Sequence, residues 1–238
     1  MTRRFGGVTA VSGVSFEVTL GARHGIIGPN GAGKTTLFNV ISGELKASGG
    51  HLHLFGRDIT RAAPAHRVGM GLGRTYQITR TFSLLTVREN LALGLNGLGR
   101  AKYRMLRHWR SYPDQARQVT DLAELVGLAE RLETIAADLS HGEVRQLEVA
   151  LALALRPRLL LLDEPGAGLS PGERVGMTRM LQRLPRELTL IMIEHDMDMV
   201  REVVDRITVL HFGEVVAEGD TREIQDDATV REIYLGSA

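Results

Sequence analysis

The sequence predicts an α/β fold with a parallel sheet, on two observations. Beyond Pro157, apolar strand patterns alternate with helical patterns at residues 158–163, 173–184, 188–193, 196–204 and 207–211. Such alternation is typical of β-α-β units, whose neighbouring strands run parallel. The second observation is a glycine-rich segment at residues 28–35, which lies between an apolar strand and a helix. The 238 residues are enough for one sizeable domain or two small ones.

The first quarter of the chain predicts strands separated by turns. Residues 14–20 alternate apolar and polar side chains, as a half-buried strand does, and residues 24–27 form a second strand. The glycine-rich segment comes next, followed by a helix at residues 34–45 with apolar side chains three or four positions apart. Residues 51–55 alternate again after a turn, which is typical of an edge strand.

The middle of the chain changes to helical periodicity. Between residues 86 and 155 apolar side chains recur three and four positions apart, as at Val119, Leu122, Leu125 and Val126. The sequence shows neither internal repeats nor low-complexity segments. We therefore expect a helical insertion within an α/β core.

The composition excludes several classes of protein. With 29 Lys+Arg, 28 Asp+Glu and a formal charge of +1, the chain lacks the basic excess that coating nucleic acid requires. Without cysteine it has no disulfide scaffold and no thiolate metal or redox site. Its apolar runs are far shorter than the roughly 20 residues that span a bilayer, and its N-terminal alternation is unlike a secretion signal. We expect a cytoplasmic protein.

One basic amphipathic stretch lies at residues 100–110. Its aromatic and apolar side chains share roughly one helical face. Two interpretations stay open, an exposed helix of the insertion or a contact with anionic lipid or a membrane partner.

A complete phosphate-binding motif lies at the glycine-rich segment. The pattern G-x-x-x-x-G-K-[ST] is matched by Gly28, Pro29, Asn30, Gly31, Ala32, Gly33, Lys34 and Thr35. Glycines let backbone N–H groups converge on phosphate oxygens, Lys34 reaches the β- and γ-phosphates, and the Thr35 hydroxyl can ligate Mg²⁺. Thr36 adds a hydroxyl near the phosphates. The motif predicts a nucleotide site, and the lack of an N-K-x-D sequence argues against a GTPase.

Two acids follow a run of four leucines at residues 159–162. The run predicts a buried parallel strand, and Asp163 and Glu164 come at its carboxyl end, where open α/β sheets bind ligands. Taken alone, two such acids are about as often only the start of a helix. Beside a phosphate-binding loop, Asp163 is placed to hold the hydration shell of Mg²⁺. Glu164 is placed to polarise an attacking water, a general-base role worth on the order of 10²–10⁴ in rate.

His195 follows the apolar strand at residues 188–193. A lone histidine in such a place is more often a satisfied loop residue than a catalytic group. No G-x-S-x-G segment is present to supply the serine of a Ser-His-Asp triad. The surroundings of His195 in the sequence favour the structural interpretation.

Further motifs stand in a definite order along the chain. They are Gln77 at a strand end, Leu-Ser-His-Gly-Glu at residues 139–143, Gly-Leu-Ser at residues 168–170, and His195. Together with the phosphate-binding motif, this order resembles the ATP-binding cassette (ABC) transporter ATPases over essentially the whole chain. The resemblance implies ATP and Mg²⁺ as ligands and Gln77 as a further magnesium contact. It also implies that His195 touches the γ-phosphate, against the structural interpretation, and that Phe5 stacks on adenine.

The segment at residues 139–143 resembles the signature motif of that family. The resemblance implies that Ser140, His141, Gly142 and Glu143 open a helix whose N-terminus binds the γ-phosphate held by the opposite subunit. A positive helix end aimed at an anion is physically sound. The sequence LSHGE departs from the family consensus LSGGQ at His141 and Glu143, so we expect contacts here to be weaker or differently tuned.

Local stretches resemble the ATP-binding subunits of branched-chain amino acid importers. They are residues 73–77, 85–91, 193–197 and 233–236. The resemblance implies ATP hydrolysis that drives import, on the inner face of the cell membrane. It implies transmembrane permease subunits, a homodimer or a heterodimer with a second ABC ATPase and, indirectly, an extracytoplasmic substrate-binding protein. The alternatives are the ATPase of a urea, short-amide or other ABC transporter, and a soluble ABC ATPase without a transport role.

The expected architecture is an α/β P-loop NTPase core with an N-terminal antiparallel β portion and an inserted α-helical subdomain. Residues 1–76 would form the N-terminal part of the core. Residues 77–149 would form the helical subdomain with the signature motif, and residues 150–238 the C-terminal part of the core.

Overall fold

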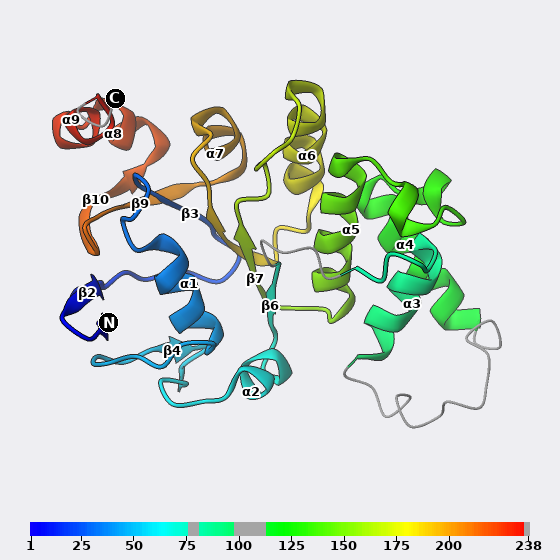
Figure 1. Cartoon of the computed structure of the whole chain (residues 1–238), viewed down its shortest axis with the longest axis horizontal. Helices are drawn as coiled ribbons and strands as arrows, with labels where there is room; N and C mark the ends of the chain where they lie inside the picture. Colours follow the sequence, from blue (N-terminus) through cyan, green and yellow to red (C-terminus); the bar gives the residue numbers. More distant parts are fainter. Residues whose placement is uncertain (76–80, 98–112, 236–238) are drawn as a thin grey trace.

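The centre of the molecule is a six-stranded sheet (Figure 1). The computed structural model describes residues 1–75, 81–97 and 113–235. Across the sheet the strands lie in the order β10 (Glu214–Asp220), β9 (Arg206–His211), β3 (Arg23–Ile27), β8 (Thr189–Ile193), β7 (Leu159–Asp163) and β6 (Leu72–Arg74). All neighbours are parallel except the edge pair β10 and β9. The predicted α/β fold is confirmed.

Both faces of the parallel strands are buried. In β7, Leu160 and Leu162 join one apolar cluster, whereas Leu159 and Leu161 join a second cluster. The first cluster contains side chains of α5 (His141–Ala154), α6 (Pro171–Arg183) and α7 (Met197–Val203). The second contains side chains of α1 (Lys34–Ser42). Burial on two sides explains why this strand is continuously apolar rather than alternating.

A helical region lies beside β6 at one end of the sheet (Figure 1). It consists of α3 (Val87–Asn96), α4 (Pro113–Val126), η3 (Ala129–Arg131), η4 (Ala136–Asp138) and α5. A capping box, in which Thr86 and Glu89 bond to each other's backbone N–H, fixes the start of α3. The expected division of the chain into three parts stays a prediction, and its boundary at residues 149 and 150 falls within α5. The basic stretch at residues 100–110 lies outside the described residues.

Two small antiparallel ribbons complete the N-terminal part. They are β1 (Arg3–Phe5) with β2 (Val8–Val11), and β4 (His53–Leu54) with β5 (Arg57–Asp58). The predicted strand at residues 14–20 was wrong, because these residues have no strand partner among the described residues. Phe16 and Val18 nevertheless pack against the second apolar cluster. The alternating pattern therefore reflects burial of one side of this segment. Such burial does not require a neighbouring strand to form hydrogen bonds with it.

The remaining helices lie near the two ends of the sheet. They are α2 (Pro64–Gly69), α8 (Thr221–Asp226) and α9 (Ala228–Leu235). Among the described residues, none of the helices has the length and apolar character needed to cross a membrane.

Candidate functional site

Several of the predicted site residues follow the carboxyl ends of adjacent parallel strands. The glycine-rich loop leaves β3, His195 follows β8, Asp163 ends β7, and Thr75 follows β6. These four strands are neighbours in the order β3-β8-β7-β6. Loops from the same edge of a parallel sheet come together in space, and this edge is where open α/β sheets bind ligands. Gln77, two positions beyond Thr75, lies outside the described residues.

The glycine-rich loop is shaped by close backbone contacts. Gly28 has φ 150° and Gly33 has φ 99°, in the region that favours glycine. A Cβ atom would lie 2.1 Å from the Leu210 carbonyl oxygen at Gly28 and 2.3 Å from the Ala10 carbonyl oxygen at Gly33. The loop thus rests against β2 and β9, and neither position has room for a side chain.

The N-terminus of α1 opens directly from this loop. No side chain caps this helix end in the described structure, and its first turn contains no acidic residue. Lys34 is 7% exposed and its Nζ donates to the carbonyl oxygens of Gly28 at 2.6 Å and Pro29 at 3.0 Å. Burial lowers the pKa of Lys34, while Glu164 and Asp163 act in the opposite direction. The loop therefore combines backbone donors with a nearby ammonium group, which suits a phosphate.

The other predicted loop residues differ in their exposure. Asn30, Gly31 and Thr35 are exposed, Pro29 and Thr36 are half-buried, and Ala32 is buried. The Thr35 hydroxyl is thus accessible from outside the loop, as a ligand-binding group must be.

Asp163 lies buried at the end of β7, at 3% exposure. Its Oδ2 accepts a hydrogen bond from Arg74 Nη2 at 3.0 Å, and Arg74 Nη1 also donates to the Ser42 hydroxyl and the Glu44 carboxylate. Burial raises the pKa of Asp163, and the Arg74 contacts oppose this rise. The second oxygen, Oδ1, is buried without a hydrogen-bond partner in the described part of the chain.

This unpartnered oxygen fits a hard cation. Mg²⁺ prefers oxygen ligands, and it binds through one or two carboxylates together with phosphates and water. Across the residues described, no group of three or more His, Asp or Glu side chains could hold a metal by itself. A magnesium ion at Asp163 would therefore depend on a bound phosphate ligand for part of its coordination.

Glu164 has an unusual backbone conformation. Its φ is 50°, and its N–H donates to the Ile193 carbonyl oxygen of β8 at 3.0 Å. Left-handed conformations are uncommon for residues other than glycine and concentrate at functional sites. The side chain is half-buried, directly after Asp163. Glu164 is thus held at the sheet edge while staying accessible.

His195 presents its ring to the surface. The side chain is 63% exposed, and Nδ1 lies 3.7 Å from Oε2 of the fully buried Glu194. Glu194 accepts backbone hydrogen bonds from Gly166 at 2.7 Å, His195 at 2.9 Å and Asp196 at 3.2 Å. The backbone that carries His195 is therefore fixed although the ring itself is accessible.

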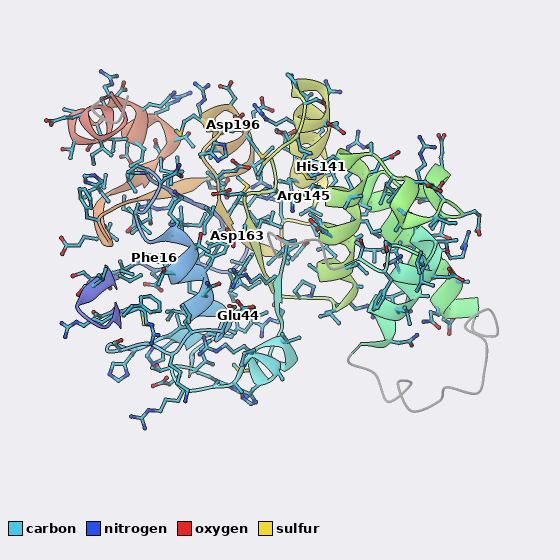
Figure 2. All side chains as sticks on the ribbon, in the orientation of Figure 1. Phe16, Glu44, His141, Arg145, Asp163 and Asp196 are labelled. Carbon is cyan, nitrogen blue, oxygen red and sulfur yellow. The ribbon has the colours of Figure 1, made fainter. Side chains whose placement is uncertain are left out.

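The predicted signature residues lie together at the start of α5. Ser140 caps this helix in a capping box with Glu143, His141 is exposed, and Gly142 is buried. The Gly142 N–H donates to Oε1 of Glu173, in the first turn of α6, at 2.9 Å. Figure 2 shows His141 on the side of the helical region and Asp163 over the sheet. The structure thus brings the signature residues to α6.

Phe5 ends β1 and is 44% exposed. The Arg3 guanidinium lies 4.4 Å from the centroid of its ring. One side of the ring therefore already has a cation–π partner. Its expected contact with adenine stays a prediction.

The sequence analysis assigned no role to Arg74, Glu173 or Glu194. Glu173 did leave a local signal, since Ser170 and Glu173 have the spacing of a capping box, which the structure confirms. The contact of Glu173 with Gly142 has no such signal in the sequence, because the two residues are 31 positions apart. Arg74 and Glu194 lie next to predicted motifs, but only the folded chain shows which atoms they contact.

Comparison with known proteins gives consistent matches. The family model for ABC transporters matches residues 11–167. The high-affinity branched-chain amino acid transport ATP-binding protein BraF of Pseudomonas aeruginosa is 38% identical, with 100% of this chain and 96% of that protein covered. The corresponding protein LivG of Salmonella typhimurium is 36% identical, with 99% and 95% covered.

Solved structures agree with this match. A nucleotide-free ATP-binding cassette from an ABC transporter has a TM-score of 0.85 at 32% identity, covering 98% of this chain and 95% of that chain. The ADP conformation of an ATP-binding cassette of an ABC transporter has a TM-score of 0.86 at 32% identity, covering 99% and 96%.

Proposed function

The chain belongs to the ABC transporter family, and on this premise we propose that it is the ATP-hydrolysing subunit of an importer for branched-chain amino acids. The observation that carries the proposal is the arrangement of the glycine-rich loop, Asp163 with Glu164, and His195 at one edge of the sheet. The cargo is supported by relatives that match over nearly the full length and are named for branched-chain amino acid transport.

Binding of ATP uses the start of α1. Backbone N–H groups of residues 30–36 and the ammonium of Lys34 would hold the β- and γ-phosphates. Lys34 would exchange its bonds to the Gly28 and Pro29 carbonyls for bonds to phosphate oxygens. Thr36 would add a hydroxyl contact, and Phe5 an aromatic surface for adenine. The bound charge is favoured because α1 presents backbone donors to it.

Magnesium would be held by the Thr35 hydroxyl, by Gln77 and, through water, by the unpartnered Oδ1 of Asp163. Mg²⁺ there would supply positive charge that neutralises the phosphate oxygens. Arg74 keeps the other oxygen of Asp163 occupied, so that Oδ1 is the oxygen directed to this role.

Hydrolysis would depend on Glu164 and His195. Glu164 would accept a proton from a water whose oxygen attacks the γ-phosphorus, while the bond from that phosphorus to the ADP oxygen breaks. His195 would donate a hydrogen bond to the γ-phosphate. The bond from the Glu164 N–H to Ile193 and the bond from the His195 N–H to Glu194 fix the backbone at both residues before ATP arrives.

Transport would require two cassettes and a permease. Two subunits would meet head to tail, so that Ser140, His141, Gly142 and Glu143 of one face the γ-phosphate of the other. The helical subdomain at residues 77–149 would transmit closure to permease subunits on the cytoplasmic face of the membrane. A substrate-binding protein would deliver the amino acid on the opposite side.

An uptake assay tests this function. In cells lacking the chain, we expect wild type to restore uptake of labelled leucine, isoleucine and valine, and Glu164→Gln to fail. Purified Glu164→Gln should bind ATP but hydrolyse it on the order of 10²–10⁴ times more slowly.

Glu187→Gln is a matched control, since it makes the same change at an exposed glutamate in the loop before β8. It should behave as wild type. Restored uptake of urea or short amides alone would replace the proposed cargo. Full turnover by Glu164→Gln would contradict the assignment of the base.

A further inference from the structure

Glu194 is a fully buried carboxylate between two loops of the site. It is 0% exposed and directly follows β8. Its Oε1 accepts the N–H of Gly166, in the loop after β7 that begins with Glu164. Its Oε2 accepts the N–H groups of His195 and Asp196, in the loop after β8. One side chain thus joins the two loops that carry the proposed base and the proposed γ-phosphate contact.

The environment of Glu194 requires an acceptor on both oxygens. Three backbone N–H groups point at the carboxylate, at 2.7, 2.9 and 3.2 Å. An ionised carboxylate accepts on both oxygens, whereas an amide would oppose at least one of these donors with its own NH₂ group. Bonds from N–H groups to a charged acceptor are also the stronger kind.

Gly166 is adapted to the same contact. A Cβ atom at this position would lie 2.7 Å from Glu194 Oε1 and 3.0 Å from the terminal methyl of Met199. The φ of Gly166 is not positive, so its backbone would tolerate a side chain. Glycine is therefore required at position 166 because a side chain would collide with the Glu194 carboxylate, and not because the backbone conformation is unusual.

A second bridge fastens the same loops closer to the surface. Arg174 Nη1 donates to Asp196 Oδ2 at 2.6 Å, and Arg174 Nη2 donates to the Leu169 carbonyl oxygen at 3.3 Å. This pair is partly exposed and therefore screened by solvent. The hydrogen bonds of Glu194 between the same loops are instead shielded from solvent, and hydrogen bonds in such surroundings are electrostatically stronger.

We propose that Glu194 is a positioning residue for ATP hydrolysis, which sets the loop of Glu164 against the loop of His195. The inference rests on the proposed function of those two residues. Because Glu194 is inaccessible, it acts through the backbone and does not touch ATP. The glycine-rich loop leaves a different strand, β3, so the phosphate contacts made by that loop do not depend on Glu194.

The test is the kinetics of Glu194→Gln and Gly166→Ala in the full chain. We expect each variant to lower kcat by at least about tenfold and to keep KM for ATP within about twofold. Both substitutions break the same contact, between Gly166 and Glu194. The kcat of the double variant should therefore fall no further than that of the worse single variant, rather than by the product of the two decreases.

Leu181→Ala controls for stability. Leu181 is fully buried in α6, within the first apolar cluster, and none of the hydrogen bonds that join the two loops involves its side chain. Its truncation should lower Tm at least as much as Glu194→Gln does. Its kcat below Tm should stay near that of wild type. A merely structural role for Glu194 predicts the same behaviour in Glu194→Gln.

The outcomes separate this inference from the function beneath it. If Glu164→Gln is inactive while Glu194→Gln and Gly166→Ala keep kcat, the positioning role is wrong and the ATPase assignment stands. Multiplicative losses in the double variant would also overturn the role. If Glu164→Gln keeps kcat, the proposed function fails instead. Should Glu194→Gln not fold, Gly166→Ala decides alone.

Discussion

The proposed function assigns two helix N-termini to phosphate, and they are built differently. At α1, Gly33 precedes the helix, no acidic side chain lies in the first turn, and Lys34 adds a positive charge. At α5, Ser140 and Glu143 form a capping box, and Glu173 of α6 accepts the Gly142 N–H. The first helix end presents its donors to an outside anion, whereas the second already has carboxylates of its own.

Under the proposed function, this difference implies two modes of phosphate binding. At α1 the loop is formed in advance, and Lys34 needs only to exchange carbonyl partners for phosphate. At α5, under the proposed function, a phosphate from the opposite subunit would have to take the Gly142 N–H from Glu173. The pKa of Glu173 is lowered to about 2, because the Ser170 hydroxyl, the Ser170 N–H and the Gly142 N–H all donate to it. The carboxylate therefore stays charged, and stays a competitor, at neutral pH.

The largest effect is expected at α1, from Lys34→Ala. A hydrogen bond to a charged group is worth about 1.5–3 kcal/mol, so we expect Kd for ATP to rise about 10–100-fold. Calorimetric titration of the Glu164→Gln background with ATP measures this change without turnover. Lys46→Ala removes an exposed lysine beyond α1 and should leave Kd unchanged. If Lys34→Ala bound ATP with the same Kd as its parent, Lys34 would not contribute to phosphate binding at α1, and the contrast with α5 would be wrong.

A smaller effect is expected on how stability depends on pH near the start of α1. His24 lies in β3, the strand that leads into the glycine-rich loop, and its Nε2 forms a hydrogen bond with Thr208 Oγ1 at 2.7 Å. Burial, together with the charge of Arg206, lowers the pKa of His24 from 6.5 to about 4. As the pH falls, His24 therefore takes up a proton in the unfolded chain before it does so in the folded chain. His24 contributes its full stability above pH 6.5, and this contribution is lost as the pH falls toward 4.

Urea unfolding at pH 7 and pH 5.5 measures this effect. We expect the free energy of unfolding to fall by about 1 kcal/mol more in wild type than in His24→Gln. His66→Gln, at an exposed histidine of α2, controls for the loss of a histidine as such. The same slope in wild type and His24→Gln would contradict the prediction. The contact of Glu173 with α5 should survive at pH 5.5, since its carboxylate is protonated only in stronger acid.

The same contrast explains how much the sequence could predict. Four strands of the sheet, β3, β7, β8 and β9, were predicted closely, with residues 158–163 expected and Leu159–Asp163 found for β7. A continuous apolar run bounded by a proline and two acids has few other interpretations. The glycine-rich loop was equally clear, because the positive φ angles of Gly28, Gly31 and Gly33 are a local requirement for glycine.

Features that depend on distant contacts were not predictable. The strand expected at residues 14–20 finds no strand partner in the part of the chain that the structure describes, and no pattern within those residues could reveal this. The capping box of Ser170 and Glu173 was visible, yet the bond from Gly142 arises only because α5 packs beside α6. Glu194 likewise joins loops that meet only when β7 and β8 pair. Local requirements leave a mark in the sequence, whereas long-range hydrogen bonds leave almost none.

The smallest effect is expected at α5, from Glu173→Ala. Removing the carboxylate frees the Gly142 N–H, so ATP-driven pairing of cassettes should strengthen about two- to fivefold, the scale of one charge at a helix end. Sedimentation of the Glu164→Gln background with ATP measures the paired fraction. Glu223→Ala is the matched control, because Glu223 forms the same kind of capping box at α8, where its carboxylate accepts the Asp220 N–H. Both variants lose a cap, but only Glu173→Ala should gain in pairing. If the two behave alike, Glu173 does not compete with phosphate, and the start of α5 is as ready for an anion as the start of α1.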